Sequence, residues 1–561
     1  MSTLGTLRTD ATMRRTTQLI IVVAILIIVA AGAWVAFNPA PTTKQPTALT
    51  ISFANVPNLD PAIGSDEASS AAFVNLYDTL VYPTSTGDVK PNVATSWTVS
   101  PDGLTYTFKL RNDVKFHDGT TLTANDVVYS LNRLMAIAKG YSYLFTPYVS
   151  SVTAPDSTTV VINLKQPFGP FLLSLVRVYI LNQALVQKNT ATQGAYGANG
   201  DYGTAWLVTH DAGSGPYMVK DVKLEEYLLM EKNPSYWQQI RSDAPDTVKF
   251  LGTTEAATIR TLMSQGQLDI TDRWQSTESL ASLSNLKGVE VVSIPTSAEF
   301  YLMMNTKMPP TDDWAFRAAM TYAFDYQTVI TSIFPGSPQA AGPVPSALPG
   351  HDPNAVKYTR DLTKARQFLA MSKYANQLDK VTVVYHWIAE VPDEEKVALL
   401  FANNMKEIGI NVQVVKVPWL RVVDEMGNLS TAPNIVSIFD EASYAEAGSL
   451  LSSRYTSKSA GTWEQNEWLL NSTIDNMIAD ALSTIDRNAR FQKYYQVQQV
   501  LMSMYPSIFV FDQNERRAYY SGYIDWYAAK GQNVPVLGYN FDCRFIGVDS
   551  AKKATLFPSG G

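Results

Sequence analysis

The sequence predicts an α/β protein of two lobes that follows a single N-terminal transmembrane helix. Three observations predict it: an apolar run at 19–37, alternating strand-like and helix-like stretches from residue 49, and two extended segments that can cross between lobes. The chain has 561 residues, of which 46% are hydrophobic and 17% charged. A large packed core is therefore available, and disorder throughout the chain is excluded.

The apolar run LIIVVAILIIVAAGAWVAF at 19–37 contains no charged residue. As a helix it would span about 28 Å, close to the apolar thickness of a bilayer. Three arginines lie within 1–18, whereas Lys44 is the only basic residue between the run and Lys90. This asymmetry predicts a cytoplasmic segment 1–18, an uncleaved signal anchor at 19–37 and an exterior remainder. The small residues at 31–33 leave a cleaved and secreted form open.

Residues 38–48, NPAPTTKQPTA, are rich in proline and threonine, which predicts an extended and fairly stiff linker. The predicted location is therefore the cell membrane, with one membrane pass and a large extracellular domain.

Lys and Arg total 44 against 51 Asp and Glu, so the basic surplus of a nucleic-acid binder is missing. The single cysteine, Cys543, excludes a disulfide framework and any multi-cysteine metal site.

The body of the chain alternates between two periodicities. Period-two patterns predict strands at 49–53, 105–110, 159–164, 381–384 and 411–417. Helical spacing predicts helices at 257–265 and 396–408, the second ended by Gly409. An Asp102-Gly103 turn predicts a hairpin before the strand at 105–110. Extended runs near 266–275 and 505–512 are the candidate crossings between two lobes, and ligands prefer the cleft between such lobes.

Two short motifs that resemble catalytic sites are interpreted as turns. The sequence Phe116-His117-Asp118-Gly119 places a histidine beside an aspartate, but neighbouring residues on a strand point to opposite faces and Asp-Gly is typical of turns. Gly213-Ser214-Gly215 lacks the lysine and the remaining glycines of a phosphate loop. We therefore expect no enzyme activity, no cofactor and no metal site.

A series of further motifs, in a fixed order, resembles a known family. The motifs are LDPA at 59–62, NLYDTLV at 75–81, PNVATSW at 91–97, DGLTYTF at 102–108, VKFHDG at 114–119, LTANDV at 122–127, GSGPY at 213–217, NPSYW at 233–237, the long run at 301–330, GPVP at 342–345 and DLTKA at 361–365. In order and spacing this series is similar to the family 5 extracellular solute-binding proteins of ABC importers, the dipeptide, oligopeptide and nickel type. The resemblance covers about 49–548.

The resemblance implies a periplasmic-binding-protein-like fold of type II, in the large cluster that carries an extra subdomain. Lobe 1 would comprise 49–266, with the subdomain inserted at about 80–185, and would be completed by the C-terminal return at 509–561. Lobe 2 would comprise 267–508. The implied function is capture of an oligopeptide in the cleft between the lobes and delivery to the permease and ATPase subunits of an ABC importer.

The segment FDEASYAEAGSLL at 439–451 departs from the family pattern. The resemblance implies an aspartate here that pairs with the α-ammonium group of a peptide, but Ser443 stands at that position, followed by Tyr444. Serine can accept a hydrogen bond but cannot neutralise an ammonium group. Asp440 or Glu441 is the candidate replacement if the alignment is shifted by a few residues.

Aromatic residues near the expected cleft favour an alternative ligand, an oligosaccharide. The candidates are Trp274 after the first crossing, Tyr385 and Trp387 at the end of the predicted strand 381–384, and Trp419 after the strand 411–417. Flat aromatic faces pack well against sugar rings, and some members of the family bind oligosaccharides. Asn55, at the end of the first strand, also faces the cleft implied by the resemblance. A second alternative is a sensory or interaction protein that keeps the fold without transport.

Overall fold

The computed structural model describes residues 47–558, which belong to one compact unit. The predicted cytoplasmic segment 1–18, the predicted transmembrane segment 19–37 and most of the predicted linker 38–48 lie outside the described residues. Among the helices of residues 47–558, none is long and apolar enough to cross a membrane.

Lobe 1 is built on a sheet with the strand order β1-β10-β9-β8, in which β1 and β10 are parallel and the other pairs antiparallel. Its strands are β1 (Ala48–Phe53), β8 (Tyr217–Lys223), β9 (Tyr227–Lys232) and β10 (Thr247–Gly252). Its helices are α2 (Glu67–Leu76), α5 (Gln183–Lys188), α6 (Ala256–Ser264) and α7 (Thr277–Leu283). The C-terminal return adds β16 (Ile524–Asp525), β17 (Gly547–Val548) and α16 (Ser550–Leu556). Leu49, Ile51 and Phe53 are fully buried in the lobe 1 core, as the alternation on β1 predicts.

The inserted subdomain has a sheet of its own with the antiparallel order β4-β5-β7-β6. Its elements are β2 (Val81–Pro83), β3 (Val89–Pro91), β4 (Ala94–Val99), β5 (Thr105–Leu110), α3 (Ala124–Ile137), β6 (Val149–Asp156), β7 (Thr159–Leu164) and α4 (Phe171–Ser174). The predicted hairpin is confirmed, since Gly103 takes a φ of +69° in the turn between β4 and β5. The apolar residues of this subdomain share one buried cluster with those of lobe 2.

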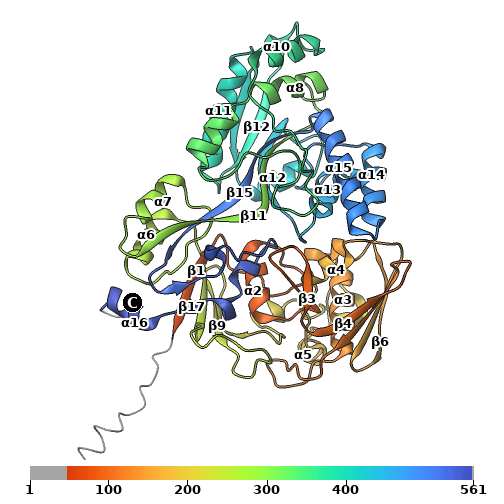
Figure 1. The fold of residues 1–561 in the computed structure, drawn as a ribbon, viewed down its shortest axis with the longest axis vertical. Helices are drawn as coiled ribbons and strands as arrows, with labels where there is room; N and C mark the ends of the chain where they lie inside the picture. Colours follow the sequence, from red (N-terminus) through yellow and green to blue (C-terminus); the bar gives the residue numbers. More distant parts are fainter. Residues whose placement is uncertain (1–46, 559–561) are drawn as a thin grey trace, which may run out of the picture. The chain divides into compact units, whose positions relative to one another are not determined.

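Lobe 2 is built on a five-stranded sheet with the order β13-β12-β14-β11-β15. Its strands are β11 (Val289–Met304), β12 (Val383–Ile388), β13 (Val412–Val417), β14 (Ile435–Glu441) and β15 (Ser507–Tyr520). Its helices are α8 (Trp314–Ala323), α9 (Tyr326–Thr328), α10 (Leu362–Met371), α11 (Asp393–Lys406), α12 (Trp419–Met426), α13 (Gly448–Tyr455), α14 (Ser472–Ser483) and α15 (Arg487–Met504). Figure 1 shows α8, α10 and α11 far from lobe 1, and α13, α14 and α15 above the subdomain.

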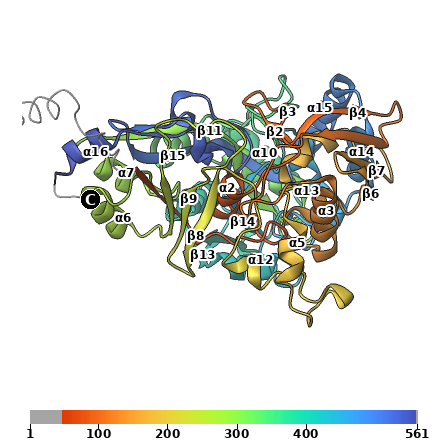
Figure 2. The same cartoon turned by 90° about the horizontal axis from the view of Figure 1, so that it is seen from below.

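Two long antiparallel strands, β11 and β15, run from one lobe into the other (Figure 1, and from below in Figure 2). Ile294 on β11 belongs to the lobe 1 core, whereas Phe300 on the same strand belongs to the core of lobe 2. On β15 the same change lies between Phe511 and Ala518. Ile270 bridges β1 to β15 and so extends the sheet of lobe 1 onto the crossing strands. The first crossing, predicted at 266–275, lies instead on β11, because Ile270 and α7 pack in the core of lobe 1. The lobe boundaries at 266/267 and 508/509 stay a prediction.

The strand predicted at 381–384 is displaced. β12 runs from Val383 to Ile388, so Tyr385 and Trp387 lie inside the strand rather than at its end. The apolar run continues to Ile388, and Tyr385 is fully buried in the core of lobe 2. By contrast, the predicted helix at 396–408 is observed as α11, and Gly409 follows it with a φ of +83°.

Candidate functional site

A buried ion-pair network joins the lobes where β11 and β15 cross. Arg273 contacts Glu441 of lobe 2 (Nη1 to Oε2, 3.0 Å) and Glu67 of lobe 1 (Nε to Oε2, 3.3 Å). Arg517 on β15 contacts Glu67 and also Glu515 (Nε to Oε1, 3.3 Å). All five side chains are 11% exposed or less. The charges therefore act on each other with little screening by water.

The local structure explains how these five groups meet. Glu67 is the first residue of α2, where Asp66 caps the helix by accepting from the amide of Ser69. Glu441 is the last residue of β14. Glu515 and Arg517 are two residues apart on β15, so their side chains leave the same face of the sheet. We call the five residues Glu67, Arg273, Glu441, Glu515 and Arg517 the interlobe charge cluster.

The interlobe charge cluster contains three carboxylates and two guanidinium groups. Burial raises the pKa of Glu441 and of Glu515, although the neighbouring arginines act in the opposite direction. Burial alone would lower the pKa of Arg273, but the three carboxylates around it raise that pKa overall. The cluster thus has one more acidic group than basic groups, and a cation placed beside it would favour ionised Glu441.

Asp440 belongs to a second buried network inside lobe 2. Arg454 on α13 donates from Nε to Asp440 (2.6 Å) and from Nη1 to Glu299 (2.5 Å). The register of β11 and β14 pairs Glu299 with Asp440, which places both carboxyl groups on the face covered by α13. Burial raises the pKa of Glu299 to about 8. Asp440 is therefore already paired with a guanidinium group in this structure.

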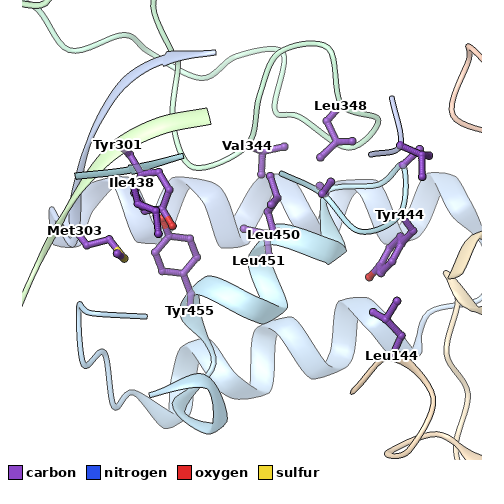
Figure 3. Close-up of a cluster of buried hydrophobic side chains, with 14 of the residues drawn as sticks. Leu144, Tyr301, Met303, Val344, Leu348, Ile438, Tyr444, Leu450, Leu451 and Tyr455 are labelled. Atoms are coloured by element: carbon purple, nitrogen blue, oxygen red, sulfur yellow. The ribbon is translucent and has the colours of Figure 1, made fainter. Parts of the chain in front are cut away.

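Ser443 and Tyr444 lie where lobe 2 contacts the inserted subdomain. The Ser443 Oγ is 2.6 Å from the Oη of Tyr143, and its carbonyl accepts from the Nε of Arg177 (2.7 Å). Tyr444 is buried, and its ring meets that of Phe168 edge-on at 6.2 Å. Figure 3 shows Tyr444 together with Leu144 of the subdomain in one buried cluster. The segment singled out in the sequence thus reaches across the lobes.

Trp274 is the tryptophan that the structure brings to the interlobe charge cluster. Its partly exposed ring lies 4.9 Å from the Cζ of Arg273 and meets Phe439 on β14 edge-on at 5.5 Å. Phe300 and Phe511 continue this aromatic surface across the sheet, at 4.7 Å and 5.9 Å from Phe439. An apolar wall therefore lies next to the charged groups at the junction of the lobes.

The other predicted residues lie in different surroundings. Tyr385 packs edge-on against Phe401 at 5.5 Å, and Trp387 is 3% exposed beneath the ammonium group of Lys416. Trp419 begins α12 and pairs with Trp463 at 5.5 Å. Asn55 is exposed and bonds to Asp66 at 3.1 Å. Ligand roles for Tyr385, Trp387, Trp419 and Asn55 stay predictions.

Sequence reasoning missed the arginines at the junction and the carboxylates on which they depend. Glu67 and Glu515 look like ordinary surface residues in the sequence, and no motif marks the contact of Glu67 with Arg517, which lies 450 positions further along the chain. Arg273 lies within the extended run 266–275, where the sequence analysis singled out only its neighbour Trp274. Arg177 follows an apolar helix end and carries no signal at all.

His117 also has a defined structural role. Its Nδ1 contacts Asp211 and its Nε2 lies 3.1 Å from the carbonyl oxygen of Gly215. Burial alone would lower the pKa of His117, but Asp211 raises it overall. Gly119 has a φ of +86°, as the predicted turn requires. This pair ties the turn at 116–119 to the segment at 211–215.

The family described as "Bacterial extracellular solute-binding proteins, family 5 Middle" matches residues 88–453. The chain is a family 5 solute-binding protein. This confirms the resemblance expected from the motifs, together with the two-lobed α/β fold.

Relatives of this family 5 protein match most of its length. The probable D,D-dipeptide-binding periplasmic protein DdpA of Escherichia coli (strain K12) is 29% identical over 468 residues, covering 82% of this chain and 87% of DdpA. The glutathione-binding protein GsiB of Escherichia coli O157:H7 is 27% identical over 464 residues, covering 81% and 86%. The DppA of Helicobacter pylori, solved with the peptide STSA, shares the fold with a TM-score of 0.75 and 21% identity, covering 90% and 98%. The two curated relatives are named as binding proteins rather than enzymes.

Proposed function

We propose that this family 5 protein is a membrane-anchored receptor that captures a short peptide between its lobes and delivers it to an ABC importer. The permease would recognise the closed form, and separate ATPase subunits would supply energy. Binding is then a population shift, because a ligand that touches both lobes stabilises the closed form. The chain's own part is recognition, and no covalent step is required.

The observation that carries this proposal is the surplus carboxylate in the interlobe charge cluster. A peptide brings an ammonium group, and a buried carboxylate with an incomplete set of cations gains most from such a group. Glu441 is the favoured acceptor because it ends β14 beside Trp274 and because burial raises its pKa. Glu441 would thereby supply the negative charge that Ser443 lacks.

The relatives support the same class of ligand. DdpA is named for D,D-dipeptides and GsiB for glutathione, which are both short peptides or peptide-like molecules. The aromatic wall of Trp274 and Phe439 offers an apolar surface beside the charges, suited to a side chain of the ligand. The same wall would suit a sugar ring, so oligosaccharides are the competing ligand class.

The apolar run at 19–37 supports the anchoring part of the proposal. With arginines before it and a proline-rich segment after it, it would hold the binding body on the outer face of the membrane. Fractionation of cells that express the full chain tests this part. We expect the protein in the membrane fraction and resistant to high salt, and release into the medium would contradict anchoring.

The ligand class is tested by thermal unfolding of the full chain in detergent. The midpoint would be recorded with peptides of two to eight residues and, separately, with oligosaccharides. A ligand at 100 times its dissociation constant adds about 2.7 kcal/mol of stability, so a bound peptide produces a clear rise. A rise with oligosaccharides alone would contradict peptide binding. Peptide binding without peptide uptake by cells would favour the sensory alternative.

A further inference from the structure

Arg177 differs from the other fully buried arginines of this chain. Arg133, Arg454 and Arg517 are equally buried, and each has a carboxylate partner. Arg177 is 0% exposed, but its Nε donates to the carbonyl of Ser443 (2.7 Å) and its Nη1 to that of Leu537 (2.9 Å). Within residues 47–558 no carboxylate lies within 4.0 Å of its guanidinium group, although its charge lowers the pKa of Glu441 from a longer distance. A buried cation with only neutral acceptors is costly, and an anion would compensate it.

The Nε and Nη2 edge of Arg177, the edge that arginines use to bind carboxylates, is only partly occupied. Arg490 in this chain holds Glu446 through that edge, with Nε and Nη2 at 2.8 Å and 2.7 Å from the two carboxylate oxygens. Arg241 holds Asp243 in the same way, with both distances 2.8 Å. On Arg177 the Nε is bound to a carbonyl, and the buried Nη2 makes no hydrogen bond, with the neutral hydroxyl of Tyr179 as a neighbour of the guanidinium group. One of the two nitrogens of this edge thus binds a neutral carbonyl, and neither binds a carboxylate.

This edge lies where three parts of the molecule meet. Arg177 comes from the inserted subdomain, Leu537 from the C-terminal return and Ser443 from lobe 2. The ring of Tyr141 covers the guanidinium group, with 4.5 Å from Cζ to the ring centre. A cavity of about 10 Å³ touches Arg177 from the side of lobe 1 and the subdomain, away from Ser443, and it is too small for a carboxylate. Because the carbonyl of Ser443 occupies Nε, an anion can bind both nitrogens of the edge only when that carbonyl moves away with lobe 2.

We propose that the Nε and Nη2 edge of Arg177 binds the carboxylate of the ligand, in place of the Ser443 carbonyl. This inference rests on the proposed peptide-binding function and adds to it the residue that recognises the negative end of the peptide. Glu441 and Arg177 would then hold opposite ends or groups of one zwitterionic ligand. Ligands without a carboxylate, such as peptide amides and neutral oligosaccharides, lose this contact.

The test compares two mixed tripeptide libraries, one with free C-termini and one with C-terminal amides, by thermal unfolding of the full chain. For the wild type we expect the free acids to raise the midpoint at a concentration at least about tenfold lower than the amides, because a charge-assisted pair of bonds is lost. Equal shifts with both libraries would overturn the role of Arg177 while leaving peptide binding intact. No shift with either library would overturn the peptide function and this inference with it.

Variants of two arginines complete the test. Arg177→Gln should respond equally to the acid and amide libraries, whereas Arg177→Lys, which keeps the charge without the fork, should retain part of the preference. Arg487→Gln is the matched control, since Arg487 also contacts across from lobe 2 to the subdomain, at Asp88 (2.5 Å), but on the exposed surface. It should keep the full preference of the wild type. An undiminished preference in Arg177→Gln would overturn the proposal.

Discussion

Tyr143 of the inserted subdomain and Ser443 of lobe 2 share a hydrogen bond, with 2.6 Å between Oη and Oγ. The carbonyl of the same serine accepts a hydrogen bond from Arg177 Nε (2.7 Å), and its amide donates to Ser449 Oγ (2.8 Å). One short segment of lobe 2 is thus fixed both to its own helix and to the opposite lobe. Contacts of this kind exist only while the lobes are together.

Removal of the Tyr143 hydroxyl should therefore weaken closure of the peptide-free protein more than folding. We expect Tyr143→Phe to raise peptide affinity by about fivefold, because the ligand no longer has to break this bond when it displaces Ser443 from Arg177, and a neutral hydrogen bond contributes about 1 kcal/mol. The unliganded thermal midpoint should hardly change, because Tyr143 is 44% exposed. A calorimetric titration beside a thermal scan checks both statements. Unchanged affinity would show that this bond has no part in closure.

Trp387→Ala should mainly reduce the stability of the fold, whereas Trp274→Ala should mainly reduce peptide affinity. Trp387 is 3% exposed inside β12, so its truncation should cost about 3–5 kcal/mol of folding free energy. Trp274 is partly exposed at the junction, so its truncation should reduce peptide affinity by about tenfold with a smaller loss of stability. Denaturant unfolding and ligand titration of both variants separate the two roles. Comparable losses of stability in both variants would contradict this assignment.

The buried pair of Arg133 and Asp60 should be required for the stability of lobe 1. Both nitrogens Nη1 and Nη2 lie 2.6 Å from the carboxylate oxygens, and both side chains are 0% exposed. Removing one partner leaves a buried charge, so Asp60→Asn should cost about 3–5 kcal/mol in urea unfolding. The double variant Asp60→Asn with Arg133→Met should recover part of that loss. A loss below 1 kcal/mol for the single variant would contradict the expected cost.

Glu467 should make stability depend on pH. Burial raises its pKa from 4.5 to about 8, and only one of its oxygens has a partner, the hydroxyl of Ser507 at 2.5 Å. Between these two pKa values the folded chain holds a proton that the unfolded chain releases, so stability falls as pH rises through this window. Burial also raises the pKa of Glu299 and that of Glu464 to about 8. Glu467→Gln should therefore show a shallower fall in midpoint from pH 5 to 9, and identical slopes would contradict the shift.

The sequence was sufficient for the elements with a clear local pattern. The hairpin at Asp102-Gly103 and the end of α11 at Gly409 depend on turn chemistry that neighbouring residues specify. The bounds of β12 were misjudged because its buried apolar run has no alternation to mark where it ends. The family could be predicted because its motifs are local and their order is preserved.

The charged site was harder to predict, for a physical reason. Arg273, Glu67 and Glu441 come from three distant segments, and their meeting depends on how β11 and β15 place the lobes. Nothing in the sequence around Arg177 distinguishes it from an arginine on the surface. Only its burial and its neutral partners in the structure distinguish it.

Binding of a peptide between the lobes can be tested by preventing the lobes from separating. Asp88 and Arg487 form an exposed contact between the subdomain and lobe 2, and the native Cys543 is fully buried. In the variant Asp88→Cys with Arg487→Cys, a short bismaleimide added to the peptide-free protein would join the two sides. We predict that the joined protein takes up no peptide from the mixed library, whereas the same variant without the linker binds normally. Equal binding by the joined and unjoined protein would contradict a site between the lobes.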